Sequence, residues 1–81
     1  MNVRVLYFSL VKRITGTAGE SVELQDGARV DDLIARLAER HPGLRQLLAS
    51  LLVTRNEEWC ERDAALADGD VVGLMPPVSG G

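Results

Sequence analysis

The sequence predicts an α+β domain, in which one main helix packs on one face of a mixed sheet of short strands. Three observations lead to this prediction. Helical periodicity is strongest in one stretch, residues 30–38. Short runs rich in β-branched and aromatic residues lie on both sides of it. The chain has 81 residues, which is enough for a single small domain covering residues 1–81.

The first predicted strand covers residues 3–8. Alternation places Val3, Val5 and Tyr7 on one face and Arg4, Leu6 and Phe8 on the other, which Arg4 marks as the solvent side. A short helical segment over residues 10–14 is expected to end at the glycine in position 16. A second strand is predicted over residues 20–25, with its valine and leucine pointing inward.

Five apolar residues spaced i, i+3, i+4, i+7 and i+8 form the stripe of the main helix: Val30, Leu33, Ile34, Leu37 and Ala38. Asp31 and Asp32 lie in its first turn, where the helix dipole favours negative charge. Arg29 is a poor capping residue, so the sequence leaves the N-cap undefined. Pro42 is expected to end the helix at residue 40 or 41.

The second half of the chain contains the remaining strands. Leucines at positions 44, 47, 48 and 51 suggest another short helical segment before a strand at residues 52–55. A turn, a short strand at Trp59-Cys60, an Asp-Gly-Asp turn and a last strand at residues 71–75 follow. A right-handed crossover through the helix then gives a β-grasp, or ubiquitin-like, arrangement with short additional helical segments.

Composition excludes several classes of function. The net charge of −3 provides no basic surface for nucleic acid or an anionic membrane. One Phe, one Trp and one Tyr are too few for a base-stacking platform. The apolar runs are shorter than a membrane span, and the N-terminal sequence lacks the features of a signal peptide, so we expect a cytoplasmic protein.

The residues that most often carry catalysis are sparse. Cys60 is the only thiol and is expected to be structural or incidental. His41, the only histidine, is expected to interact with the dipole at a helix end. No second Cys or His is available for a metal site, and no glycine-rich phosphate loop is present. The Asp and Glu residues are expected to form a solvated surface. The chain is therefore predicted to bind no cofactor and to have no catalytic activity alone.

Three large apolar residues could form a partner-binding patch. Phe8 lies on the outward face of the first strand, and Met75 ends the last one. If these two strands are neighbours, Phe8, Trp59 and Met75 form an exposed patch that leads to the C-terminal residues, and such patches usually bind a partner. The alternative is that Phe8 and Trp59 belong to the core.

The ending, residues 76–81, is predicted to be a flexible tail. Pro76 and Pro77 favour extended geometry that directs the chain away from the domain. The four residues that follow can reach at most about 14 Å. They are Val78, Ser79, Gly80 and Gly81. The paired glycines have no Cβ and could enter a narrow active site to present the Gly81 carboxylate. The alternative is a frayed terminus or a cloning remnant.

A carboxylate is a poor electrophile, so the Gly81 carboxylate needs activation. Adenylation by a partner that uses ATP would give an acyl-adenylate. A sulfur donor could then convert it to a thiocarboxylate, or an amine could trap it as an isopeptide. In either case the carrier itself contributes presentation of the tail and binding of partners.

The ending from Asp68 to Gly81 resembles the C-terminus of the small subunits of molybdopterin synthase, which are ubiquitin-like sulfur carriers. The opening, from Val5 through Ser9 to Gly16, is similar to the opening of that family. The family often has an Arg-Glu pair where this chain has Lys12-Arg13. This departure is expected to change the surface charge and the choice of partner.

The resemblance implies that an E1-like adenylyltransferase activates Gly81 and that a sulfur donor protein converts it to a thiocarboxylate. The large synthase subunit would hold the tail in its active site, in a complex of two small and two large subunits. Sulfurs from two successive carriers would convert cyclic pyranopterin monophosphate to the dithiolene of molybdopterin. The positions of Phe8, Trp59 and Met75 would contribute to the partner interface.

Three alternatives stay open. The chain could carry sulfur for thiamin thiazole synthesis or tRNA thiolation, although thiazole carriers are usually shorter and lack the Pro-Pro-Val segment. It could be a ubiquitin-like modifier attached to lysines of target proteins. It could also be a ubiquitin-like interaction domain with an inert tail.

Overall fold

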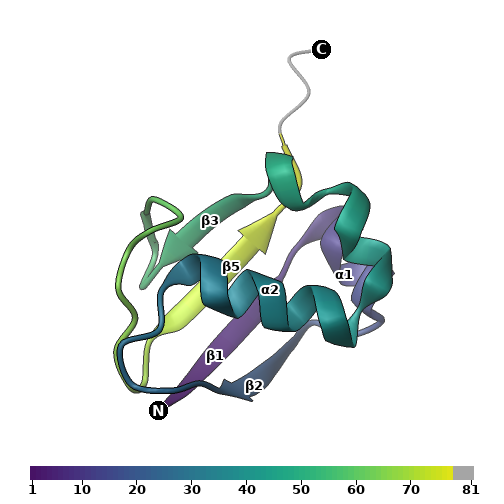
Figure 1. The fold of residues 1–81 in the computed structure, drawn as a ribbon. Coiled ribbons are helices and arrows are strands. Elements are labelled where there is room, and N and C mark those ends of the chain that lie inside the picture. Colours follow the sequence, from purple (N-terminus) through teal and green to yellow (C-terminus); the bar gives the residue numbers. More distant parts are fainter. Residues whose placement is uncertain (78–81) are drawn as a thin grey trace.

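The computed structural model describes residues 1–77, and its elements follow the predicted order (Figure 1). The bounds differ from the predicted ones by a few residues at most. The elements are β1 (Asn2–Tyr7), α1 (Ser9–Thr15), β2 (Gly19–Glu23), α2 (Val30–Arg40), the 3-10 segments η1 (Pro42–Gln46) and η2 (Leu48–Ser50), β3 (Leu52–Arg55), β4 (Glu58–Trp59) and β5 (Val71–Met75).

The five strands form one mixed sheet with the order β2-β1-β5-β3-β4. The pairing of β1 with β5 is parallel, with Val5 beside Val72 and Tyr7 beside Leu74. The other pairings are antiparallel. The first and last strands are therefore neighbours inside the sheet, as the patch prediction requires. The β-grasp prediction is confirmed.

The core lies between the sheet and α2, which runs across one face (Figure 1). All five residues of the predicted apolar stripe are buried. In β1, Val3, Val5 and Tyr7 are also buried, whereas Arg4 is exposed, so the predicted alternation is confirmed. Each Å2 of apolar surface that is buried stabilises the fold by about 25 cal/mol, so this interface is the main contribution to the stability of the domain.

The start of α2 shows how a helix begins after a poor capping residue. The Arg29 side chain does not cap the helix; instead, its backbone N–H donates to the Asp32 carboxylate at 2.8 Å. This is the half of a capping box in which the third helical residue reaches back. The helix ends at Arg40, as predicted, and Pro42 begins η1.

A two-residue turn joins β3 to β4. Asn56 and Glu57 both have left-handed backbones, with φ of 52° and 72°. Because the turn is this short, β4 begins at Glu58, and the strand predicted at Trp59-Cys60 is wrong by one residue. The Asn56 side chain ties the turn to β5: its oxygen accepts from the N–H of Val71 at 2.9 Å.

Candidate functional site

One row of residues crosses the sheet on the face opposite α2. The strand register places Leu6 of β1 beside Gly73 of β5, and Gly73 beside Thr54 of β3. Thr54 in turn lies opposite Trp59 of β4. Side chains from four strands, including the first and the last, therefore converge on one stretch of the outer face.

These residues form a hollow of about 380 Å3, which we call the outer groove. Phe8 is 43% exposed and Trp59 is 68% exposed. Both belong to the surface, which rules out the alternative that they are core residues. The groove is lined by Leu6, Phe8, Thr54, Glu57, Trp59, Val71, Gly73 and Met75.

Gly73 gives the outer groove its depth. A Cβ at this position would lie 2.5 Å from Oγ1 of Thr54 and 3.3 Å from Cε2 of Phe8. The first distance is shorter than real contacts allow, so a side chain here would displace its neighbours. A glycine inside a strand often marks such a close approach.

A second hollow, of about 390 Å3, continues from the outer groove and is called the tail hollow. Its walls are Phe8, Ser9, Met75, Pro76 and Pro77. The two hollows share the side chains of Phe8 and Met75. The exposed apolar surface therefore extends from Trp59 to the base of the predicted tail. The other predicted tail residues, Val78, Ser79, Gly80 and Gly81, lie outside the described residues.

A polar cluster lies on the α2 side of the sheet, around the Glu20 carboxylate. The Tyr7 hydroxyl donates to Oε2 at 2.6 Å, and Arg40 donates to Oε1 at 2.7 Å. Nε2 of His41 lies 2.6 Å from Oε2. The cluster links β1 and β2 to the end of α2. The prediction that acidic residues are all solvated surface is wrong for Glu20, because β2 points it toward α2.

The cluster changes the acidity of two groups. Burial opposes ionisation of Glu20, but hydrogen bonds from Tyr7, His41 and Arg40 outweigh it and lower the Glu20 pKa to about 2. Burial, together with the bond to ionised Glu20, raises the pKa of Tyr7 well above its usual range. His41 thus has a wider role than the predicted dipole interaction, since it bonds Glu20 and meets the Tyr7 ring edge-on.

Cys60 is half-buried and packs against the core, as predicted for a structural residue. Burial raises the pKa of its thiol, which disfavours the reactive thiolate. Within residues 1–77, no group of three or more His, Cys, Asp and Glu side chains could hold a metal ion. No helix in this range is both long and apolar enough to cross a membrane.

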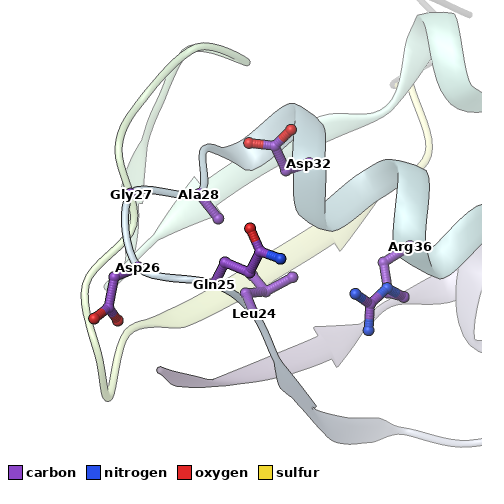
Figure 2. Close-up of a pocket in the computed structure, with 7 residues that line it drawn as sticks. All are labelled: Leu24, Gln25, Asp26, Gly27, Ala28, Asp32 and Arg36. Carbon is purple, nitrogen blue, oxygen red and sulfur yellow. The ribbon is translucent and has the colours of Figure 1, made fainter.

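A further hollow, of about 300 Å3, lies between the β2–α2 loop and α2 (Figure 2). Asp32 and Arg36 line it from the helix, and Leu24 to Ala28 line it from the loop. Leu24 donates its N–H to Met1, so this hollow is at the end of β1 opposite the tail hollow. Asp32 already caps α2. We therefore place the candidate site at the outer groove and the tail hollow.

Comparison with known proteins identifies the family of the chain. The sequence profile of the ThiS family matches residues 5–81. The chain belongs to the ThiS family. It is 36% identical to the molybdopterin synthase sulfur carrier subunit of Chlamydomonas reinhardtii, over the full length of both chains. It is 34% identical to the protein of the same name from Mycobacterium tuberculosis, covering all of this chain and 99% of the relative.

Solved structures show the same fold as this ThiS-family chain. A putative molybdopterin converting factor subunit 1 from Pyrococcus furiosus is 35% identical, with a TM-score of 0.88, covering 96% of this chain and 99% of that one. Small archaeal modifier protein 1 from Haloferax volcanii is 27% identical, with a TM-score of 0.86 and coverage of 95% and 98%. A chain in the complex of subunits 1 and 2 of the Helicobacter pylori molybdopterin-converting factor is 28% identical, with a TM-score of 0.72 and full coverage of both chains.

Sequence reasoning missed several lining residues in this ThiS-family chain. Leu6 shares the outward face with Phe8, so alternation alone could have included it. Gly73 was visible as a glycine inside an apolar strand. Thr54, Glu57 and Val71 gave no such signal, because they reach the groove through strand pairing and a turn.

Proposed function

We propose that this chain is the sulfur carrier subunit of a molybdopterin synthase. The outer groove and the tail hollow would dock on the large subunit, while the tail enters that subunit's active site. The carrier would have no catalytic activity alone. Its part would be to present the Gly81 carboxyl group and to bind its partners in turn.

The proposed chemistry takes place at Gly81. The carboxylate attacks the α-phosphate of ATP held by an E1-like adenylyltransferase, which releases pyrophosphate and gives an acyl-adenylate. Sulfide from a sulfur donor protein then displaces AMP and leaves a thiocarboxylate. This sulfur then attacks a carbon of the pterin precursor and displaces an oxygen substituent, which leaves with its bonding electrons. Water then cleaves the bond between the sulfur and the acyl carbon. The sulfur stays on the pterin, and Gly81 returns to the carboxylate.

The observation that carries this proposal is the continuity of the exposed apolar surface with the base of the tail. Phe8 and Met75 belong to both hollows, and Pro76 and Pro77 line the second. A partner that covers this surface is therefore brought next to the residues that follow Pro77. Full-length similarity to sulfur carrier subunits, and to a subunit found in a two-subunit complex, supports the same function.

The direct test is the intact mass of the chain after incubation with its host's lysate, ATP and a sulfur source. We expect a mass gain equal to the replacement of one oxygen by sulfur, localised to Gly81. A chain lacking Gly81 is the matched control and should show no gain. If a known carrier is thiocarboxylated in the same lysate and this chain is not, the proposal is wrong.

A second candidate function is that of a protein modifier. The similarity to small archaeal modifier protein 1 favours it, because the same activated tail could be trapped by a lysine amine. Isopeptide-linked adducts that appear in cells and disappear on deletion of Gly81 would establish this use. Sulfur transfer to a thiazole or a tRNA would involve the same thiocarboxylate and would differ only in the acceptor. We propose the cytoplasm as the compartment for all of these reactions.

A further inference from the structure

We propose that Glu57 is a specificity residue of the outer groove, placed to pair with a cationic side chain, Lys or Arg, on the large synthase subunit. This inference rests on the proposed function and names one contact of the partner. It concerns a turn residue outside the predicted patch of Phe8, Trp59 and Met75.

The backbone of Glu57 is the first observation. With φ of 72°, it occupies the left-handed region that favours glycine. It is the second of the two residues that join β3 to β4, a position where hairpins with both turn residues left-handed prefer glycine. Backbone strain of this kind is common where a side chain is needed for function.

The surroundings of Glu57 are the second observation. Of the residues that the structure describes, it is the only ionisable one that lines the outer groove, whose other walls are mainly apolar. Among residues 1–77, the Glu57 carboxylate makes no ion pair and no side-chain hydrogen bond, although Asn56 beside it is fixed to Asp70 and Val71. A charge that is free in this way is available to a partner.

Burial of the groove then imposes a condition on that partner. A partner surface that covers Phe8 and Trp59 also removes water from the Glu57 carboxylate. Burying an unpaired carboxylate is strongly unfavourable, so a matching partner must supply a cation at this point. A protein with an apolar surface of similar shape but without the cation would be rejected.

Glu58 provides a matched control in the same turn region. It is also exposed and carries the same charge, but it lies in β4 opposite Arg55 and is not among the lining residues. Substitutions at the two positions change the net charge equally. Any difference between them therefore reports position and not overall charge.

The experiment titrates the full chain against purified large subunit by calorimetry at low and high salt. The variants are Glu57→Gln, Glu57→Lys and Glu57→Gly, with Glu58→Gln and Glu58→Lys as controls. We expect Glu57→Lys to weaken binding by about tenfold or more, and Glu57→Gln to weaken it less while reducing its salt dependence. The Glu58 variants should stay within about threefold of the unsubstituted chain, as for rim charges.

The Glu57→Gly variant separates the effect of this residue on stability from its effect on partner binding. It removes the left-handed strain, so we expect a higher melting temperature together with weaker binding. Melting curves of every variant show that the compared proteins are folded, and the glutamine variant preserves the test if the lysine variant does not fold.

Unchanged affinity in Glu57→Gln and Glu57→Lys, or equal losses of affinity at Glu57 and Glu58, would overturn the inference about Glu57 and leave the proposed function standing. Failure of the unsubstituted chain to bind the large subunit would overturn the inference and the proposed partner together.

Discussion

At the scale of single residues, Trp59 is the clearest case of a large apolar side chain kept at the surface. It is 68% exposed and comes from a two-residue strand at the edge of the sheet. The fold gains little from such a position, whereas interfaces are enriched in tryptophan. Its position opposite Thr54 places it at one end of the outer groove.

Replacing Trp59 with Glu should therefore weaken binding of the large subunit by about tenfold or more, as expected for an aromatic anchor at an interface. The melting temperature should change little, because the side chain is mostly exposed. Calorimetric titration and a thermal melt measure the two effects. Ala35→Glu, an exposed position on α2, is the control and should leave affinity unchanged. Equal affinity of Trp59→Glu and the unsubstituted chain would contradict the docking role.

At the scale of elements, β5 combines two functions. Val72 and Leu74 point into the core, while Val71, Gly73 and Met75 form the outer groove between β1 and β3. The strand leads directly to Pro76 and the tail hollow. A change on its outer face can therefore alter partner binding with the inner face intact.

Gly73→Ala tests this arrangement. The new Cβ would lie 2.5 Å from Thr54 Oγ1 and 3.3 Å from Phe8, so at least one of these side chains must move. We expect a loss of about 1–3 kcal/mol in the free energy of unfolding, typical of overpacking. Large-subunit affinity should also fall, measured by the same titration. Two double variants isolate the clash. Gly73→Ala combined with Thr54→Ser keeps the hydroxyl and its clash, whereas Gly73→Ala combined with Thr54→Ala removes the hydroxyl. If large-subunit affinity is restored only in the double variant with Thr54→Ala, the clash with the Thr54 hydroxyl is the cause of the lost affinity.

The Glu20 cluster joins three elements and predicts a dependence of stability on pH. The Glu20 pKa is lowered from an ordinary 4.5 to about 2. Ionised Glu20 therefore makes its full contribution to the free energy of unfolding above about pH 4.5, and this contribution is lost as the pH falls toward 2. Urea unfolding at several pH values should show this loss in the unsubstituted chain.

Glu20→Gln should lower the unfolding free energy at neutral pH by about 1–3 kcal/mol, because donors around the carboxylate lose a charged acceptor. The stability of this variant should then fall less between pH 4.5 and 2. Glu23→Gln, an exposed position in the same strand, is the control and should retain the acid-dependent loss. Parallel pH profiles for all three proteins would contradict the role of Glu20.

Most of the elements could be predicted because their signals are local. The stripe of α2 and the alternation of β1 depend on residues close in sequence, and both were confirmed. The start of β4 depends on the length of the turn, which pattern alone does not define. The Glu20 cluster brings together residues 7, 20, 40 and 41, whose contact requires the packing of α2 on β2. Thr54 and Val71 similarly join the groove only through strand register.

At the scale of the whole molecule, stability and the proposed chemistry depend on different residues. The core cluster extends from Val3 to Leu74 and lies on the α2 side of the sheet. The proposed reaction takes place at Gly81, and the proposed docking surface lies on the opposite face. The two properties should therefore be separable by substitution.

Deletion of Gly81 should abolish sulfur transfer while leaving the melting temperature unchanged. Ile34→Val, in the core, should do the reverse: it should lower the unfolding free energy by about 0.5–1.5 kcal/mol and leave thiocarboxylate formation intact. Intact mass and urea unfolding report on the two properties. Wild-type transfer by the deletion variant would rule out the proposed role of Gly81.

The parallel pairing of β1 with β5 also has a consequence for synthesis on the ribosome. β1 is made first, but its central neighbour β5 is made last of the strands, and Tyr7 meets Leu74 only when both have emerged. Such distant pairing makes closure of the sheet a late event. The outer groove needs both strands, so a nascent chain in which β5 has not yet paired with β1 cannot display it. An activating enzyme that recognises this groove would bind only carriers in which β5 has paired with β1, and it would consume no ATP on chains without this pairing.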